Sequence, residues 1–490
     1  MLTRRTRERA ERRLRLVAGV AALSASACGR LRYDAERRDA GSTADAVLYD
    51  TRAAVSDAHR VTDAPDASTI PSLVARLHGS GSVFVYDLAV GPEREVYVVG
   101  SYDGELRAGA IATATSLAGC FLARFDLDGR AAWLADVSSA VVGCESVDVE
   151  SDRVVFGGYT APDAMLKIQR ADGRVDTSML PTGSRQVSQA ILLTRAGDLI
   201  NTLALDASGN DQMRGVDLTA DRVFFSGSYA ATSSGFGGVL LPDGREMPAA
   251  SDHGFLISYA LPTGVVLSGW AQPFAGDSDT IVFGSDADST GVCASGRYVT
   301  QLDIGADSSI EGTASRRGFI ASFDPSGALI AANQGEPVNT FRHVIRASGS
   351  CVGLRSGDDA PPVIVVRMDA RTGTTTRAEV GAVPTLSVSS DFTLSTSGDA
   401  LIPGAYGPGM WALGATTETF DSRAAIVLNL SADGSASVRR VPVLGDAAAQ
   451  AVGRDADGLV VATSYSGDIA VDGMRMTSEG ASDVVLVRMR

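Results

Sequence analysis

A unit of about 60 residues recurs along most of the chain, and this repeat constrains the fold more than any other feature. In each copy an apolar run ends in small residues, usually Gly or Ser, and a Tyr follows them. Six copies carry this pattern, at Val96–Tyr102, Val154–Tyr159, Val223–Tyr229, Val292–Tyr298, Leu401–Tyr406 and Leu459–Tyr465. Successive Tyr residues are 57, 70, 69, 108 and 59 positions apart, and the long interval leaves room for one more copy. A degenerate copy without Tyr occupies it at Cys351–Arg355, which makes seven copies.

Each copy continues with a further apolar run, a turn rich in Asp and Gly, and another run. Phe121–Phe125 before Asp126–Gly129 and Phe319–Phe323 before Asp324–Gly327 are two examples, and the second copy also holds an insertion around Met165–Pro181. Short β-branched and aromatic runs, separated by Gly and Asp about every 8–12 residues, are typical of an all-β fold and not of βαβ units.

Four strands in each unit make a propeller blade, so the sequence predicts a seven-bladed β-propeller over residues 71–490. The last copy has only three strands before Arg490. Leu73–Gly79 resembles the fourth-strand segment around Trp133, so we expect this N-terminal strand to complete the last blade and close the ring. A row of β-sandwiches, the alternative, predicts no such offset between the two ends.

The order of these features (an apolar strand, Gly-Ser-Tyr, a hairpin, an apolar strand with an Asp-x-x-Gly turn, then Trp) resembles the β-propeller repeats of secreted and lipid-anchored proteins of Gram-negative bacteria. The resemblance covers residues 73–490. It implies a propeller fold and no particular activity, because propellers host binding, scaffolding and many chemistries.

The N-terminus has the pattern of an export signal. Seven Arg residues precede a 12-residue apolar stretch, Leu16–Ala27, which would rise about 18 Å as a helix and is too short to span a membrane. Leu23–Gly29 resembles the lipobox of bacterial lipoproteins, although Ala25 stands where Leu is usual. We therefore expect residues 1–27 to be a lipoprotein signal peptide and Cys28 to be lipidated; an ordinary secretory signal is the alternative.

Residues 28–70 are rich in Asp, Ala, Ser and Thr and show no sustained apolar period, so they are predicted to be a disordered tether; a short helix is the alternative. The whole chain has a net charge of −15, and cleavage would remove a basic segment. An acidic chain lacks the basic surface that displaces counterions from phosphates, so nucleic acid is not an expected partner. The 43 basic residues include a single Lys, Lys167.

Two patterns with chemical potential have a structural explanation. Gly349–Gly353 has the spacing of a nucleophile elbow with Cys351 as the nucleophile, but it lies inside a strand repeat, with His343 only eight residues before Cys351. Asp126–Gly129 and Asp455–Gly458 resemble fragments of calcium loops, but both lack the third Asp and are predicted to be hairpin turns. No catalytic, metal-binding or cofactor-binding residue is predicted, and no cofactor is expected.

The recurring aromatic residues are expected to be structural as well. A Tyr at the same place in each blade packs between blades more often than it forms a binding ring. Trp133 and Trp270 are expected in the core or between blades, and Trp411 is the Trp residue expected at the surface.

Four Cys residues follow Cys28, and an even number in an exported chain predicts two disulfides. Cys120 and Cys144 are placed where the third strand of one blade and the first strand of the next begin, so they are expected to pair. Cys293 and Cys351 occupy nearly the same place in neighbouring blades and form the second candidate pair; free buried thiols are the alternative.

These observations predict an outer-membrane lipoprotein, on the periplasmic or surface side, because Gly29 is not the Asp that retains some lipoproteins at the inner membrane. The propeller would be a non-catalytic binding or scaffolding platform for an unidentified protein or glycan, and the lipid anchor would bind the membrane. The alternative is an extracytoplasmic hydrolase or lyase that acts on polysaccharide at the central channel. Convergent carboxylates or metal ligands at the channel mouth would favour the enzyme.

Overall fold

The computed structural model describes residues 72–113, 119–140, 142–181, 186–205, 211–230, 253–261, 269–276, 279–304, 308–312, 316–337, 340–356, 363–380, 386–389, 391–413, 416–420, 422–456 and 458–489. The expected signal peptide, Cys28 and the expected tether lie outside the described residues. The described residues form β-strands joined by turns, and no helix among them is long and apolar enough to cross a membrane.

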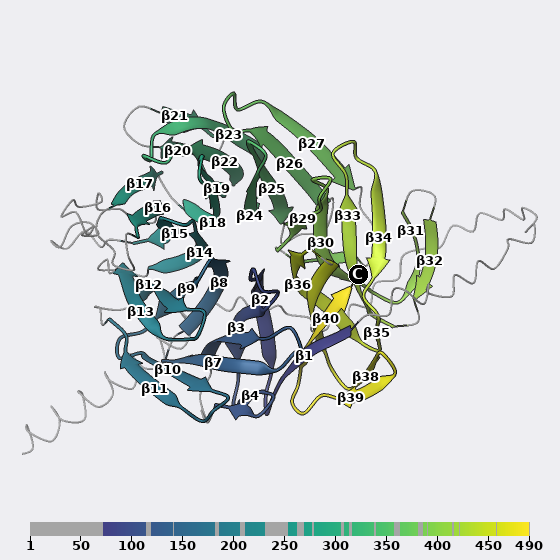
Figure 1. Cartoon of the computed structure of the whole chain (residues 1–490). Coiled ribbons are helices and arrows are strands. Elements are labelled where there is room, and N and C mark those ends of the chain that lie inside the picture. The colour runs from purple at the N-terminus through teal and green to yellow at the C-terminus, as the bar shows by residue number, and fades with distance from the viewer. Residues whose placement is uncertain are drawn as a thin grey trace, which may run out of the picture. The chain divides into compact units, whose positions relative to one another are not determined.

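Seven antiparallel sheets with four or more strands follow one another in chain order within these residues (Figure 1). We call their four-stranded cores blades 1 to 7 and give the strands of each from the innermost outwards. Blade 1 contains β2 (Val83–Val90), β3 (Val96–Tyr102), β6 (Gly119–Phe125) and β7 (Ala131–Ser138); blade 2 contains β8 (Val142–Glu150), β9 (Arg153–Thr160), β12 (Val187–Thr194) and β13 (Leu199–Leu205); blade 3 contains β14 (Gln212–Leu218), β15 (Arg222–Tyr229), β16 (His253–Ala260) and β17 (Gly269–Ala275).

The remaining blades follow the same order. Blade 4 contains β18 (Ile281–Asp288), β19 (Gly291–Tyr298), β22 (Arg317–Phe323) and β23 (Leu329–Pro337); blade 5 contains β24 (Thr340–Ala347), β25 (Ser350–Ser356), β26 (Val363–Asp369) and β27 (Thr375–Val380); blade 6 contains β28 (Leu386–Val388) with β29 (Thr393–Leu394), then β30 (Ala400–Tyr406), β33 (Ala424–Leu430) and β34 (Ala436–Arg440); blade 7 contains β36 (Ala447–Asp455), β37 (Gly458–Tyr465), β40 (Asp483–Met489) and β1 (Ser72–Gly79). This arrangement is an all-β propeller.

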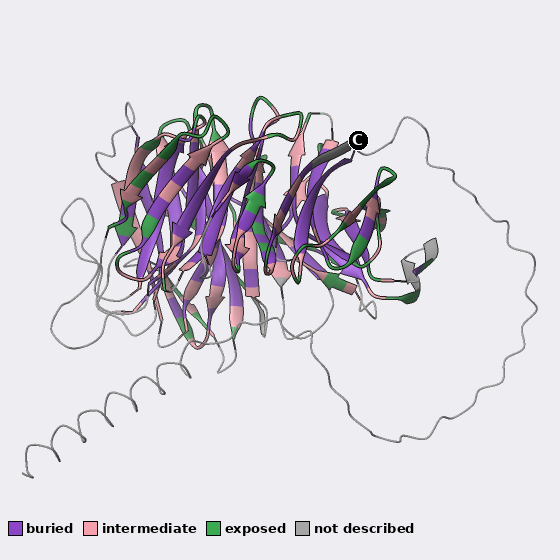
Figure 2. Cartoon of the chain, turned by 90° about the horizontal axis from the view of Figure 1, so that it is seen from below, coloured by how far each residue is buried: buried purple, intermediate pink, exposed green. Residues whose placement is uncertain are grey.

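Each blade buries both of its faces, because the side chains of a strand alternate between the two neighbouring blades. In β3, Val96 and Val98 pack towards blade 7, whereas Tyr97 and Val99 pack towards blade 2. The described residues contain seven apolar clusters of this kind, and each cluster joins two successive blades. Buried positions therefore run along the strands, and exposed positions gather in the turns at their ends (Figure 2).

The recurring turn and Trp form a second contact between blades. Trp133, on the outer strand of blade 1, donates from Nε1 to the carbonyl oxygen of Arg195 in blade 2, at 3.0 Å. Trp270 of blade 3 donates in the same way to Pro325 of blade 4, at 3.1 Å. The indole of Trp133 lies against Gly197, where an added Cβ atom would come within 3.0 Å of the ring. The Gly of this turn therefore makes room for the Trp of the preceding blade, and the predicted inter-blade position of Trp133 is confirmed.

The first strand of the propeller pairs with the last one, as we expect from the sequence. Leu73 lies opposite Val487 and Leu77 opposite Val484 in the antiparallel pairing of β1 with β40. The buried carboxylate of Asp483 accepts hydrogen bonds from Arg76 Nη2 at 2.7 Å and from the backbone N–H of Gly79 at 3.3 Å. Leu77 is fully buried in the cluster shared by blades 7 and 1. The N-terminal strand is therefore both an edge strand of blade 7 and part of its core.

Hairpins between the second and third strands of blades 1, 2 and 4 extend the sheet of the preceding blade, which the sequence analysis did not predict. The hairpin β4 (Leu106–Ala108) and β5 (Ile111–Ala112) of blade 1 pairs with β1. The insertion expected around Met165–Pro181 is the hairpin β10 (Met165–Arg170) and β11 (Val175–Met179), and it pairs with β7. The hairpin β20 (Gln301–Ile304) and β21 (Ser308–Glu311) pairs with β17. Each hairpin covers an edge whose N–H and C=O groups would otherwise be open.

Both predicted disulfides are confirmed, and each joins two neighbouring blades. Cys120 on β6 bonds to Cys144 on β8, with Cα atoms 5.5 Å apart. Cys293 on β19 bonds to Cys351 on β25, with Cα atoms 5.7 Å apart. All four side chains are buried. The bonds therefore link blades 1 and 2 and blades 4 and 5 across their apolar contacts.

We expect Leu77→Ala to lower the free energy of unfolding by about 2–5 kcal/mol, because it leaves a cavity where blade 7 meets blade 1. Denaturant titration would measure this loss. Leu127→Ala is the matched control, since Leu127 is 46% exposed in a turn, and it should change the stability by less than about 0.5 kcal/mol. Equal effects of the two substitutions would contradict a structural role for β1.

Candidate functional site

The innermost strands share an irregularity that explains the Gly of the repeat. In six blades one extra residue interrupts the pairing of the first strand with the second, which is a β-bulge. These residues are Tyr86, Glu145, Arg214, Phe283, Arg342 and Gln450. Beside the bulges of blades 1 and 2, a Cβ atom on Gly100 or Gly158 would come within 1.9 or 1.8 Å of a carbonyl oxygen of the bulged strand. Only Gly permits this close approach.

Carboxyl groups of the innermost part of three blades bind the backbone of the following blade. Asp87 of blade 1 accepts from the N–H of Val147 in blade 2 at 2.9 Å, and Asp148 of blade 2 accepts from Leu218 in blade 3 at 2.7 Å. Asp391 of blade 6 accepts from Val452 in blade 7 at 2.9 Å. These Asp residues, with Asp217, Asp286 and His343 on the innermost strands of blades 3, 4 and 5, form what we call the axial belt.

The axial belt concentrates like charges away from water. The carboxyl groups of Asp148 and Asp217 act on each other, and the charge of Asp286 acts on Asp217. Burial, followed by these neighbouring charges, raises the pKa of Asp217 well above its usual range. Asp286 keeps some exposed surface, but protein surrounds its carboxyl group, and this burial raises its pKa to about 7. Burial raises the pKa of Asp148 as well. Burial and like charges therefore favour the protonated forms of these carboxyl groups.

His343, in blade 5, is the one imidazole of the axial belt. His343 Nε2 lies 3.9 Å from Asp391 Oδ1, and the His343 ring meets Phe392 edge to face. Burial lowers the pKa of His343, and burial raises the pKa of Asp391 well above its usual range. Both groups are therefore shifted towards their neutral forms. Among the described residues, no three His, Cys, Asp or Glu side chains come together as metal ligands.

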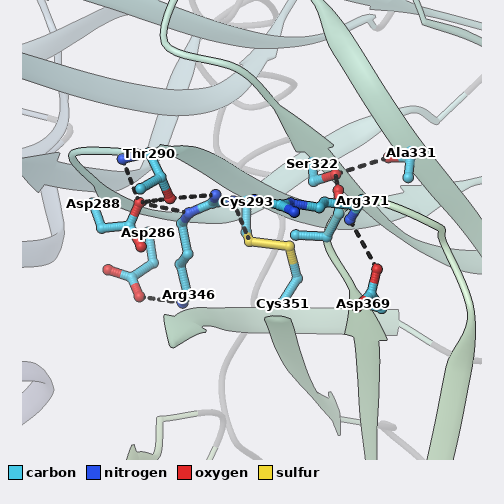
Figure 3. The surroundings of a disulfide bond; sticks show 11 residues. Asp286, Asp288, Thr290, Cys293, Ser322, Ala331, Arg346, Cys351, Asp369 and Arg371 are labelled. Atoms are coloured by element: carbon cyan, nitrogen blue, oxygen red, sulfur yellow. Dashed lines mark hydrogen bonds and ion pairs between the residues drawn. A yellow bond between two sulfur atoms is a disulfide. The ribbon is translucent and has the colours of Figure 1, made fainter. Parts of the chain in front are cut away.

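Figure 3 shows how the belt connects to the disulfide between blades 4 and 5. The backbone N–H of Arg346, in blade 5, donates to the carboxylate of Asp286 in blade 4. The Arg346 guanidinium donates to Asp288 at 2.8 Å and to Thr290 at 2.9 Å, and its Nη1 lies 3.6 Å from Cys293 Sγ. One Arg therefore joins the belt, an ion pair and the disulfide across the same blade contact.

A pocket of about 230 Å³ opens between blades 1 and 2, beside the bulges at Tyr86 and Glu145. Phe84 and Tyr86 of β2 line one side, and Glu145 of β8 lines the other. Glu145 accepts from Arg214 Nη1 at 2.7 Å, and the Arg214 guanidinium lies 5.8 Å from the centre of the Tyr159 ring. The pocket therefore combines aromatic surfaces with an ion pair that is already formed.

The elbow-like and calcium-loop-like segments of the sequence make the following contacts in the structure. Cys351 of the elbow-like segment is bonded to Cys293 inside a strand pair. Asp126 Oδ1 accepts from the backbone N–H groups of Asp128 and Arg130, which is a hairpin turn. The Asp455 carboxylate forms an ion pair with Arg488 at 3.2 Å.

The repeated Tyr residues are mostly packed, as predicted. Tyr102, Tyr229, Tyr298, Tyr406 and Tyr465 are at most 2% exposed. Tyr102 donates to Asp136 on the outer strand of its own blade, and Tyr298 donates to Gln334. Tyr159 keeps partial exposure and lines the pocket between blades 1 and 2. The side chain of Trp411 lies outside the described residues.

The sequence analysis missed the axial belt and the pocket. One signal was available for the belt: Asp148, Asp217 and Asp286 stand 11 or 12 residues before the repeated Tyr of their blades. Aligning the innermost strands on these Tyr residues would have placed the three carboxyl groups at one level. The residues that line the pocket do not recur with the repeat, because they differ from those at the same positions in other blades.

Comparison with known proteins gives structural neighbours only. The WD40 β-propeller domain of Doa1 aligns at 14% identity and a TM-score of 0.40, over 85% of this chain and 97% of that one. The phage phi92 endosialidase aligns at 8% identity and a TM-score of 0.37, over 85% and 69%. The rhamnogalacturonan lyase YesW aligns at 10% identity and a TM-score of 0.32, over 85% and 75%. No protein-family model and no curated protein matches the sequence.

We expect the stability of the chain to fall between pH 5 and pH 8. The folded chain holds protons that the unfolded chain releases above about pH 4, because burial raises the pKa of Asp286 to about 7. This part of the stability is present below the unfolded pKa and is lost as the pH rises through the folded pKa. Asp286 alone should contribute a decrease on the order of 2 kcal/mol.

Urea unfolding at the two pH values, at constant ionic strength, would measure the difference. Asp286→Asn keeps an acceptor for the Arg346 N–H and should reduce the difference, whereas Asp128→Asn, at an exposed turn, should leave it unchanged. An unchanged difference in Asp286→Asn would show that Asp286 does not titrate in this range.

Proposed function

We propose that this chain is an exported lipoprotein whose closed, seven-bladed β-propeller is a non-catalytic binding platform, anchored in the outer membrane through Cys28. Residues 1–27 would be removed, residues 28–70 would be the tether, and residues 71–490 would form the platform. The disulfides Cys120–Cys144 and Cys293–Cys351 are the observation that carries the export part of the proposal. Buried disulfides form and persist in oxidising compartments and are rare in the reducing cytosol.

The axial belt favours a platform over a hydrolase or lyase. Convergent carboxyl groups could act as general acid and base, and the raised pKa values of Asp148 and Asp217 suit an acid. However, one carboxylate oxygen in each of Asp87, Asp148 and Asp391 accepts a hydrogen bond from a backbone N–H of the next blade. Such groups hold blades together, and a substrate would have to compete with these bonds. The open aromatic surface lies elsewhere, in the pocket between blades 1 and 2.

The anchor is tested by Cys28→Ala in the full chain, expressed in a Gram-negative host. The wild type should enter the detergent phase on extraction of the membranes, and the variant should move to the aqueous phase, because all the acyl chains would be attached to Cys28, through its thiol and its α-amino group. Ser24→Ala, which changes the same segment and keeps the thiol, is the control and should behave as the wild type. Equal partitioning of Cys28→Ala and the wild type would overturn the lipoprotein assignment.

A further inference from the structure

We propose that the pocket between blades 1 and 2 binds a neutral sugar unit of a glycan, with Tyr86 and Phe84 as the stacking surface. This inference rests on the proposed role of the propeller as a binding platform and names its ligand class. The exposure of the two rings, the shape of the pocket and its charge support this ligand class.

The exposure of Phe84 and Tyr86 is exceptional in this chain. They are 42% and 43% exposed, and every other aromatic side chain that the structure describes is buried or only partly exposed. Both belong to β2 and are two positions apart, so they project from the same face of the strand. At the same level the other bulges carry Glu145, Arg214, Phe283, Arg342 and Gln450. The blade fold therefore does not require an aromatic pair here.

The pocket floor is made by Tyr rings that occupy the space beside two Gly residues. A Cβ atom on Gly143 would lie 2.7 Å from the Tyr159 ring, and one on Gly119 would lie 2.6 Å from the Tyr102 hydroxyl. Any larger residue would push these rings out of place. The Tyr86 hydroxyl is 3.0 Å from Ser101 Oγ, which fixes the Tyr86 ring at the rim. The aromatic surfaces are therefore held in position before a ligand arrives, which lowers the entropic cost of binding.

The charge of the pocket favours a neutral ligand. Glu145 is neutralised by Arg214 at 2.7 Å, so it does not offer the free charge that a cationic ligand would need. The exposed carboxylate of Asp103 stands at the rim and would repel an anion. The pocket lining still offers both kinds of hydrogen-bonding group, since the carboxylate of Glu145 accepts from hydroxyl protons and the hydroxyl groups of Ser101 and Tyr86 donate as well as accept.

A sugar ring has the complementary chemistry: its C–H faces are apolar, and its hydroxyl groups lie around the edge. A volume of about 230 Å³ is below the usual range of small-molecule pockets, about 300–1,000 Å³. It suits one sugar unit whose neighbours in the glycan continue over open surface.

The test uses the purified mature chain and calorimetric titration with cellohexaose, maltohexaose, mannohexaose and xylohexaose. Binding of at least one of them is expected. Tyr86→Ala and Phe84→Ala should each weaken it about tenfold, which is 1.4 kcal/mol, whereas Tyr86→Phe keeps the ring and should stay close to the wild type. Met474→Ala removes an exposed apolar side chain of blade 7 and is the matched control. Circular dichroism and denaturant unfolding would establish that each variant is folded.

Two further probes distinguish a failure of the glycan assignment from a failure of the proposed binding platform. Binding of hexa-arginine or trigalacturonate in a Tyr86-dependent manner, without binding of any neutral oligosaccharide, would overturn the glycan assignment and leave a binding platform. Absence of binding by all four neutral oligosaccharides, or binding that Tyr86→Ala and Phe84→Ala leave unchanged, would also overturn the assignment. Release of new reducing ends from a bound glycan would support the pocket and contradict the non-catalytic proposal.

Discussion

Burial of apolar surface between neighbouring blades is the interaction on which the rest of the structure depends. A four-stranded sheet with alternating apolar side chains, such as Val98 and Val99 of β3, has two faces to remove from water. One neighbour covers only one face, so a linear row of such sheets would leave an apolar face open at each end. In a ring every face is covered, and here the cluster of blades 7 and 1 contains Val85 together with Ala451. Three further interactions join neighbouring blades where these apolar faces meet: the ion pair of Arg195 with Glu95, the disulfides, and the hydrogen bonds from Trp to the turn of the next blade. They fix the register of one blade against the next.

The bulges connect this packing to the centre of the propeller. An extra residue changes which side chains of the innermost strand point towards the next blade, and it brings a carbonyl oxygen close to the second strand. At Gly100 and Gly158 the close approach leaves no room for a side chain, which accounts for the Gly before the Tyr in blades 1 and 2, whereas Arg355 and Thr463 hold this place in blades 5 and 7. The bulged strands of blades 1 and 2 also carry Asp87 and Asp148, which accept from N–H groups of the following blades. The Gly before the Tyr is visible in the sequence, and it stands beside strands whose Asp side chains are hydrogen-bonded to the next blade.

Much of the fold could be predicted because a repeat fixes both strand period and strand order. The pairing of Leu73–Leu77 with the last strand followed from a missing strand, and both disulfides followed from the positions of the Cys residues in the unit. The hairpins could not be predicted in this way. Leu106–Ala108 pairs with a strand of another unit, and nothing in its own unit specifies that partner. The axial belt was missed because a single Asp in a short strand is a weak signal until the bulge in its register is known.

The repeat also separates residues that serve the fold from residues free to serve a ligand. Tyr102, Tyr229 and Tyr298 stand at equivalent places and are buried, so a common packing role accounts for them. Phe84 and Tyr86 break the pattern because they form an aromatic pair that no other bulge carries, and they remain exposed. Exposed aromatic surface costs solvation free energy and is not required by the blade, so a role outside folding explains it better. This contrast, which uses the other blades as internal controls, is the reason we propose binding between blades 1 and 2 and not at the carboxyl groups of the axis.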